Sequence, residues 1–152
     1  MLNEHFACEM LMGRETLAEG LTRKLDNNEE FNLGDLTVRT LFTPGHTSDS
    51  YCFLISDRLF TGDTLLIGET GRTDFQNGNS ESAYNSLFEI LLKLPDDTIV
   101  YPGHDYNGRS SSTIGEEKKT NPRLQVKSQR EYVDMMSNCL LYTSDAADDS
   151  GC

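Results

Sequence analysis

The stretch TPGHTSDSYCFLISDRLFTGDTLL, residues 43–66, constrains the fold of this chain more than any other segment. Its two apolar runs are separated by the turn sequence of residues 56–58, which predicts a β-hairpin. His46 precedes the first run and Asp63 follows the second. Because the strands of a hairpin run in opposite directions, its start and its end lie at the same edge of the sheet. The sequence therefore predicts that His46 and Asp63 lie close together.

A third polar residue is expected at the same edge. Residues 80–94 have the apolar spacing of a helix, and residues 98–102, TIVYP, have the composition of a short buried strand. A strand–helix–strand crossover makes the two strands parallel. His104, in the loop GHDYNG after the second strand, should then emerge beside Asp63. Ligands of open α/β sheets favour this edge, so we expect His46, Asp63 and His104 to converge.

Two imidazoles and one carboxylate at one edge can bind a metal ion. This combination suits zinc or non-haem iron better than calcium or magnesium. Each residue alone has an ordinary explanation, since histidine is commonly a surface or hydrogen-bonded residue and Asp63 could bond its own backbone in a turn. The joint placement of the three residues favours the metal site.

Arg72 and Tyr106 are candidates for substrate binding. Arg72, in GRTDFQ, could hold a substrate carboxylate by a two-point contact, and the alternative is a loop ion pair with Asp74 or Glu69. Tyr106 follows His104 closely and could point its hydroxyl into the same site. The alternative for Tyr106 is a tyrosine that packs its ring and exposes its hydroxyl to water.

The rest of the pattern predicts further elements of an α/β domain. Residues 31–42 alternate around Gly-Asp, which predicts a second hairpin, and residues 127–138 have the spacing of a last amphipathic helix. Leucines recur every fourth residue over 15–25, which predicts a short helix there. Ser80 or Ser82 is expected to cap the helix of residues 80–94.

Charge and composition exclude several classes of function. A net charge of -12 argues against a nucleic-acid surface. No apolar run approaches the ~20 residues that cross a bilayer, and acids stand where a targeting segment carries basic residues, so a cytoplasmic protein is expected. The four cysteines form no close pair, which argues against a disulfide framework or a zinc knuckle. Cys52, in YCFLI, is expected to be a buried thiol.

These stretches resemble the metallo-β-lactamase superfamily. TPGHT and GDT look like its third and fourth metal motifs, and PGHDY looks like its last. LFTGDTLLIGETGRTDFQNG, LPDDTIVYPGHDYNG and STIGEEKKTNPRL are similar to the glutathione-dependent persulfide (sulfur) dioxygenases. The resemblance covers about residues 12–138. It implies an α/β fold over residues 1–138 that is the C-terminal portion of an αββα sandwich without the N-terminal metal motif. Residues 139–152 have no clear period and end in small and acidic residues, so we expect a non-native or disordered tail there, the alternative being an ordinary frayed terminus.

The resemblance also implies a ligand set. In the dioxygenases two histidines and one aspartate hold one iron, and by position TPGHT supplies His46 and GDT supplies Asp63. The other histidine belongs to an upstream His-x-His-x-Asp-His motif, which this sequence does not contain. His104 matches a position that binds a second metal in the glyoxalase II hydrolases and lies next to the iron in the dioxygenases. Arg72 is implied to anchor a carboxylate of glutathione.

The activity implied is the oxidation of glutathione persulfide by O2, with Fe(II), to sulfite and glutathione. The chain itself is expected to be inactive as a fragment, because it supplies two of three iron ligands. One alternative is a zinc-dependent hydrolase of hydroxyacylglutathione thioesters of the glyoxalase II kind, and another is a non-catalytic fragment. No nucleic-acid or membrane partner is expected, and a homodimer is left open.

Overall fold

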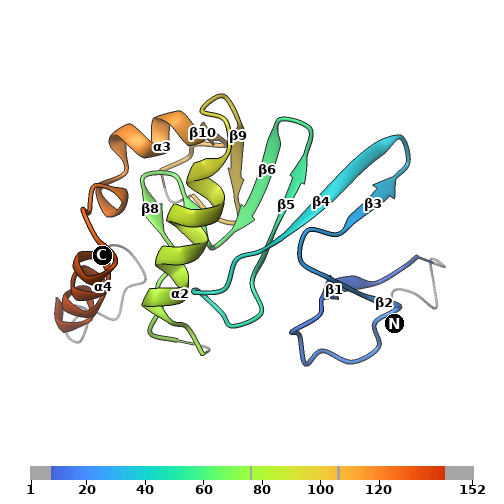
Figure 1. Ribbon diagram of the computed structural model, residues 1–152, viewed down its shortest axis with the longest axis horizontal. Coiled ribbons are helices and arrows are strands. Elements are labelled where there is room, and N and C mark those ends of the chain that lie inside the picture. Colours follow the sequence, from blue (N-terminus) through green and yellow to red (C-terminus); the bar gives the residue numbers. More distant parts are fainter. Residues whose placement is uncertain (1–7, 76, 106, 143–152) are drawn as a thin grey trace.

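The computed structural model of the chain describes residues 8–75, 77–105 and 107–142, with the backbone alone described at 139–142 (Figure 1). Its centre is a six-stranded sheet with the strand order β10-β9-β6-β5-β4-β3. Helix α2 crosses one face of this sheet, while the β1–β2 pair and helix α4 lie at opposite ends of the molecule (Figure 1). No helix in the described part of the chain is long and apolar enough to cross a membrane.

Both predicted hairpins are confirmed. Strands β3 (Glu30–Leu33) and β4 (Leu36–Phe42) pair antiparallel around a turn in which Gly34 has a φ of 60°. Strands β5 (Tyr51–Ile55) and β6 (Arg58–Gly62) form the hairpin that begins beyond His46 and ends before Asp63.

The predicted crossover is confirmed as well. Strand β9 (Ile99–Pro102) pairs parallel with β6, and the two-residue strand β10 (Ser112–Thr113) pairs antiparallel with β9. Because β4 and β6 both run antiparallel to β5, strands β4, β6 and β9 share one direction and end at one edge of the sheet. That edge is where the candidate residues were expected.

The crossover helix begins differently from the prediction. It consists of α2 (Ser80–Asn85), a π-helical stretch (Ser86–Ile90) and a 3-10 turn (Leu91–Lys93). Its N-cap is Asn79, whose side chain accepts a hydrogen bond from the Ser82 amide. The expected cap at Ser80 or Ser82 is therefore wrong, because a capping residue must lie outside the helix with extended backbone, as Asn79 does.

Between β6 and the crossover helix lies a small separate hairpin of β7 (Leu65–Leu66) and β8 (Glu69–Thr70). After β10 the chain forms α3 (Ile114–Thr120), a 3-10 turn (Pro122–Leu124) and α4 (Gln129–Tyr142). The last helix is confirmed in type, and its backbone continues four residues past position 138. The domain boundary there stays a prediction, and residues 143–152 lie outside the described part.

The helix predicted over residues 15–25 is wrong. Two three-residue strands, β1 (Leu11–Gly13) and β2 (Arg23–Leu25), pair parallel in this region. Leu17 is 95 % exposed whereas Leu25 is buried, so the regularly spaced leucines share no common face. Gly20 has a φ of 74°, which interrupts a helix.

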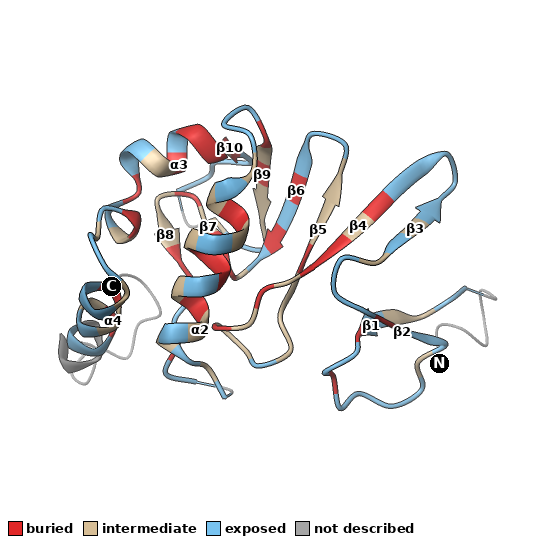
Figure 2. Cartoon of the chain, in the orientation of Figure 1, coloured by how far each residue is buried: buried red, intermediate tan, exposed pale blue. Residues whose placement is uncertain are grey.

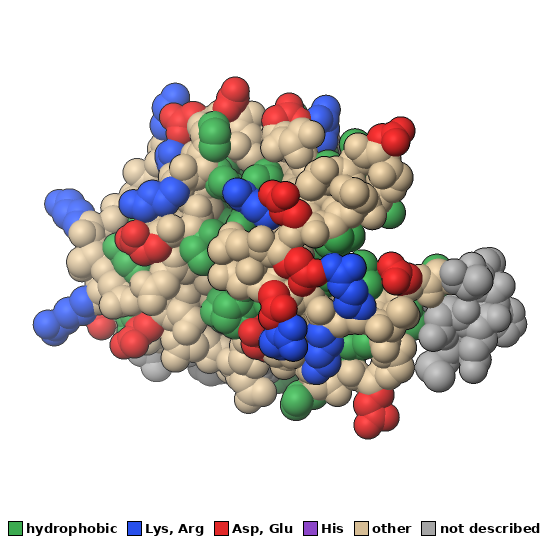
Figure 3. Space-filling model, turned by 45° about the vertical axis from the view of Figure 1, so that its right-hand side comes forward, with side chains coloured by type: hydrophobic (Ala, Val, Ile, Leu, Met, Phe, Trp, Pro, Cys, Tyr) green, Lys and Arg blue, Asp and Glu red, His purple; other side chains and the backbone are tan. Residues whose placement is uncertain are grey.

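Charged side chains of both signs occur together on the surface. Arg14 pairs with Asp26, and Arg23 pairs with Glu29, around the β1–β2 unit. Figure 3 shows acidic and basic side chains next to one another on the face turned toward the reader. Some of the acidic side chains are thus neutralised locally by ion pairs.

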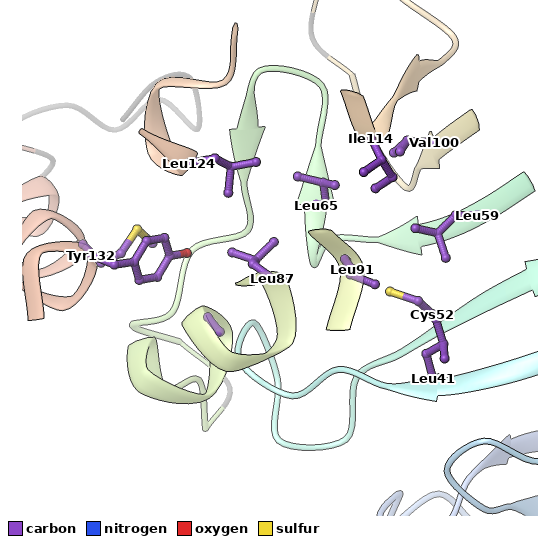
Figure 4. Close-up of a cluster of buried hydrophobic side chains, with 12 residues drawn as sticks. Leu41, Cys52, Leu59, Leu65, Leu87, Leu91, Val100, Ile114, Leu124 and Tyr132 are labelled. Atoms are coloured by element: carbon purple, nitrogen blue, oxygen red, sulfur yellow. The ribbon is translucent and has the colours of Figure 1, made fainter. Parts of the chain in front are cut away.

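The core lies between the sheet and the helical elements. Figure 2 shows buried residues along β4, β6 and the inner side of α2, and Figure 4 shows Leu87 and Leu91 gathered with residues of the strands. Cys52 is fully buried in this cluster, as predicted, and burial raises the pKa of its thiol to about 11.

Candidate metal centre

The three candidate donors meet at the edge where β4, β6 and β9 end. Asp63 lies between the two histidines: its Oδ1 is 2.6 Å from Nδ1 of His104, and its Oδ2 is 3.7 Å from Nε2 of His46. Their side chains are 24 % (His46), 30 % (Asp63) and 58 % (His104) exposed, so the cluster is open to solvent. The expected convergence is therefore observed.

The orientation of His46 is determined by a backbone group. Its Nδ1 lies 2.8 Å from the carbonyl oxygen of Arg72. A carbonyl oxygen only accepts hydrogen bonds, so Nδ1 carries a proton, and in the neutral ring Nε2 then presents a lone pair. A metal-binding histidine typically donates its other ring N–H to a carbonyl or carboxylate in this way. His46 is thus oriented with its free electron pair toward Asp63.

The gap between His46 and Asp63 is wide enough to hold a metal ion. An imidazole lone pair and a carboxylate oxygen repel each other unless a metal ion lies between them or the nitrogen carries a proton. Two donors that each bind at about 2.0–2.2 Å can share one ion at any separation up to about 4 Å, and the observed separation is 3.7 Å. These two residues therefore fit two positions of a metal site.

A third ligand is not supplied by the described residues. His104 directs Nδ1 into its hydrogen bond with Asp63. Among the side chains that the structure describes, those of residues 8–75, 77–105 and 107–138, no group of three or more His, Cys, Asp or Glu is arranged to hold a metal ion. The described part of the chain thus contains a two-donor arrangement with a histidine beside it.

Glycines allow the loops to approach one another closely. A Cβ added at Gly71 would lie 1.9 Å from the backbone oxygen of Asp63 and 3.0 Å from Nδ1 of His46. A Cβ at Gly103 would lie 2.9 Å from Oδ1 of Asp63. The 1.9 Å and 2.9 Å distances are shorter than real Cβ contacts, so the site favours glycine at both positions. The sequence shows a glycine beside each donor residue. It does not show which glycine makes a close contact with another loop.

The start of α2 abuts the His46 loop. The Asn79 amide donates to the carbonyl of Gly45 (2.8 Å), and the hydroxyl of Ser86 donates to the carbonyl of Pro44 (2.6 Å). A Cβ at Gly45 would lie 2.4 Å from the Cα of Ala83. The helix therefore fixes the backbone that precedes His46.

Arg72 is paired in the way the ordinary explanation expected. Its Nε and Nη2 donate to the two carboxylate oxygens of Asp74, at 2.8 and 2.7 Å. These hydrogen bonds lower the pKa of Asp74 below its usual value. The guanidinium also lies 5.9 Å from the ring centroid of Phe75. Tyr106 lies outside the described residues, so its predicted role stays a prediction.

A pocket beside His104 was not anticipated from the sequence. It is a shallow hollow, open to solvent, between the β7–β8 turn and the loop that follows β9, and its cavity volume is only about 10 Å³. Its lining residues are Leu66, Ile67, Glu69, His104, Asp105 and Asn107. No local sequence signal indicated that this turn faces His104.

Residues 9–104, which contain all three candidate donors, match the metallo-β-lactamase superfamily. The chain belongs to this superfamily, and its mixed α/β sheet is part of the corresponding fold.

Individual relatives fall into two enzyme groups. The chain is 37 % identical to the human mitochondrial persulfide dioxygenase ETHE1 over 86 % of this chain and 52 % of the relative. It is 47 % identical to a hydroxyacylglutathione hydrolase of Dictyostelium discoideum over 62 % of this chain and 37 % of the relative. The crystal structure of ETHE1 from Myxococcus xanthus superposes with a TM-score of 0.86 at 44 % identity, covering 90 % of this chain and 60 % of that one. The chain spans about half the length of the curated relatives it matches, or less.

Proposed function

We propose that this chain carries part of the catalytic domain of a glutathione-dependent persulfide dioxygenase, and that His46 and Asp63 are two ligands of its Fe(II) ion. The observation that carries the proposal is the orientation of His46, whose Nδ1–H is bound by the Arg72 carbonyl while Nε2 faces Asp63. Similarity to the human and Myxococcus xanthus proteins over most of the chain supports the dioxygenase assignment.

The residues of this chain bind and orient. His104 holds Oδ1 of Asp63, which leaves Oδ2 directed toward His46. Arg72, which binds Asp74 in this structure, is proposed to exchange that partner for a carboxylate of glutathione. When bound, Fe(II) supplies the dioxygen chemistry that oxidises the terminal sulfur of glutathione persulfide; one O2 and one water are consumed, and glutathione and sulfite are formed. A cytoplasmic location and a homodimer remain predictions.

Oxygen uptake and metal content test this proposal. We would compare the 152-residue chain with a chimera in which the N-terminal segment of the Myxococcus xanthus relative precedes it. We expect the chimera to bind about one Fe(II) per chain, because it adds the missing donors, and to consume O2 with glutathione persulfide. The 152-residue chain alone should bind iron weakly and show no uptake.

Controls within the site sharpen this test. His46→Gln and Asp63→Asn in the chimera should each remove iron and activity, whereas Arg58→Gln, at the far end of the β5–β6 hairpin, should change neither. Zinc as the sole bound metal, together with no oxygen uptake by the chimera, would contradict the proposal. A sharp thermal transition of the 152-residue chain with tightly bound iron would contradict its being an inactive fragment.

A zinc-dependent thioester hydrolase is the second candidate. The similarity to the Dictyostelium discoideum hydrolase favours it. The donor types are compatible with it, because they suit zinc as well as iron. Zinc bound there would lower the pKa of a coordinated water to about 7. Hydrolysis of lactoylglutathione by the zinc-loaded chimera, without oxygen uptake, would select this function.

A further inference from the structure

The β7–β8 turn is held by side chains from later parts of the chain. Nη2 of Arg109 donates to the carbonyl of Ile67 at 2.6 Å. The amide of Gly68 donates to Oε2 of Glu117 at 2.9 Å. The carbonyl of Glu69 accepts from Nδ2 of Asn121 at 2.9 Å. Three consecutive residues of one short turn thus each have a backbone group bonded to a side chain, and the partners lie 42 to 52 positions later in the chain.

Two of these side chains are completely enclosed. Glu117 is 1 % exposed and Asn121 is 0 % exposed, and Nδ2 of Asn121 also donates to Oε2 of Glu117 at 2.8 Å. Hydrogen bonds between buried polar groups fix their geometry, because losing one bond leaves its partner unsatisfied. Both residues belong to the segment STIGEEKKTNPRL, to which the proposed chemistry assigns no role.

Arg109 connects the turn to the His104 loop. The same Nη2 that bonds Ile67 lies 3.2 Å from Oδ1 of Asp105, the residue that directly follows His104. The carboxylate of Asp105 is only 7 % exposed, and its Oδ2 accepts from the amides of Asn107 and Arg109, at 3.0 and 2.6 Å. One guanidinium therefore spans the two walls of the pocket beside His104.

We propose that the β7–β8 turn is a preformed wall of the substrate pocket and that Arg109, Glu117 and Asn121 are positioning residues that set its distance from His104. The inference rests on the proposed function in taking glutathione as the ligand. A wall that is already rigid spares the ligand the cost of ordering it on binding. Loosening the wall should weaken the binding of the glutathione portion while the metal donors stay in place.

Hydrogen exchange at the Gly68 amide tests whether the wall is held in this way. In Glu117→Ala the amide loses its acceptor, and we expect its exchange to accelerate by about tenfold or more. Glu117→Gln keeps an acceptor oxygen and should retain most of the protection. The Gly103 amide, bonded to the Gly62 carbonyl at 2.7 Å, is the internal reference and should not change. Equal protection in Glu117→Ala and the unchanged chain would overturn the proposal, as would equal loss in both variants.

Arg109 provides a variant that does not disturb the interior, since its side chain is 46 % exposed. We expect Arg109→Gln to weaken glutathione binding by about fivefold or more. The binding is measured by NMR titration of the Leu66 and Ile67 methyl groups. Arg109→Lys should recover part of the affinity, and Arg58→Gln, a surface arginine paired with Asp57, should not change it. Unaltered binding in Arg109→Gln would overturn the positioning role.

The two levels of inference fail separately. If the unchanged chain binds no glutathione, the proposed substrate fails, and the exchange rates at Gly68 still decide whether the turn is held by Glu117. If glutathione binds equally well to a variant with a loosened turn, the dioxygenase proposal is unaffected and the positioning role of the β7–β8 turn is refuted.

Discussion

His46 acquires its orientation from a single backbone hydrogen bond. The sequence placed this histidine near Asp63 through the geometry of a hairpin, which depends only on strand direction. It could not show that the carbonyl of Arg72 fixes the ring, because that contact joins residues 26 positions apart in two loops. In the structure the backbone of Arg72 thus has a role that its side chain alone did not suggest.

Gly71→Ala should damage the site without touching a donor. The new methyl group would lie 1.9 Å from the backbone oxygen of Asp63, so the loop must move and carry the Arg72 carbonyl with it. We expect a loss of about 1–3 kcal/mol in the free energy of unfolding and, in the chimera that adds the further donors, a fall of about 10–100-fold in Co²⁺ affinity. Urea denaturation and absorption titration with Co²⁺ measure the two effects.

Gly34→Ala is the matched control for this substitution. Gly34 has a φ of 60° but no atom within 4 Å of a new Cβ, and it lies in the β3–β4 turn. Only a cost of about 1 kcal/mol for the backbone conformation is expected, with unchanged Co²⁺ affinity. Co²⁺ affinity that is equal in the chimera with and without Gly71→Ala would show that the close approach is irrelevant to the site.

Cys52 should make stability depend on alkaline pH. Desolvation raises the pKa of this buried thiol from 9.0 to about 11. Because the folded-state pKa is the higher one, the stabilising contribution is complete below pH ~9 and is lost as the pH rises toward ~11. Relative to Cys52→Ala, which has no thiol, the free energy of unfolding should fall by about 2 kcal/mol between pH 8 and pH 10.5. Parallel pH profiles of the two proteins in urea denaturation would refute the assignment.

At the scale of elements, success and failure of the sequence predictions have separate physical causes. The hairpins and the crossover follow from local alternation and short turns, so the sequence predicted them and the edge where the donors converge. The helix over 15–25 failed because leucine spacing does not show which leucines are buried, and Leu17 is almost fully exposed. The β7–β8 turn could not be foreseen, since its partners Glu117 and Asn121 are remote in sequence.

The cap of α2 offers a test at this scale. Asn79 accepts from the Ser82 amide, and its own amide bonds the carbonyl of Gly45 in the His46 loop. Asn79→Ala removes the side-chain acceptor and should lower the free energy of unfolding by about 1 kcal/mol. Asn79→Ser retains a capping oxygen and should stay within a few tenths of a kcal/mol of the unchanged chain. If the alanine and serine variants melt alike, the side-chain cap does not contribute.

The whole molecule is asymmetric about its sheet. One face packs against the helical elements through residues such as Leu59 and Val100, which are fully buried. On the other face Phe53, Phe60 and Tyr101 occupy paired positions on β5, β6 and β9, and the rings of Phe60 and Tyr101 stack with centroids 5.4 Å apart. Phe60 is 41 % exposed, and the other two are partly buried. An aromatic row of this kind promotes association with other apolar surfaces when it is exposed to water.

This aromatic row should determine how the 152-residue chain behaves in solution. We expect the chain to bind the dye ANS and to elute earlier in size-exclusion chromatography as its concentration rises, because contiguous exposed apolar surface drives association. Phe60→Thr should reduce both effects, and threonine suits a strand position, so the free energy of unfolding should change by no more than about 1 kcal/mol. Leu17→Thr removes an isolated hydrophobic side chain that is 95 % exposed and should leave both effects unchanged. Both substitutions replace an exposed hydrophobic side chain with threonine, but only Phe60 belongs to the aromatic row. Equal dye binding and equal elution in the two variants would therefore show that the row is not the associating surface.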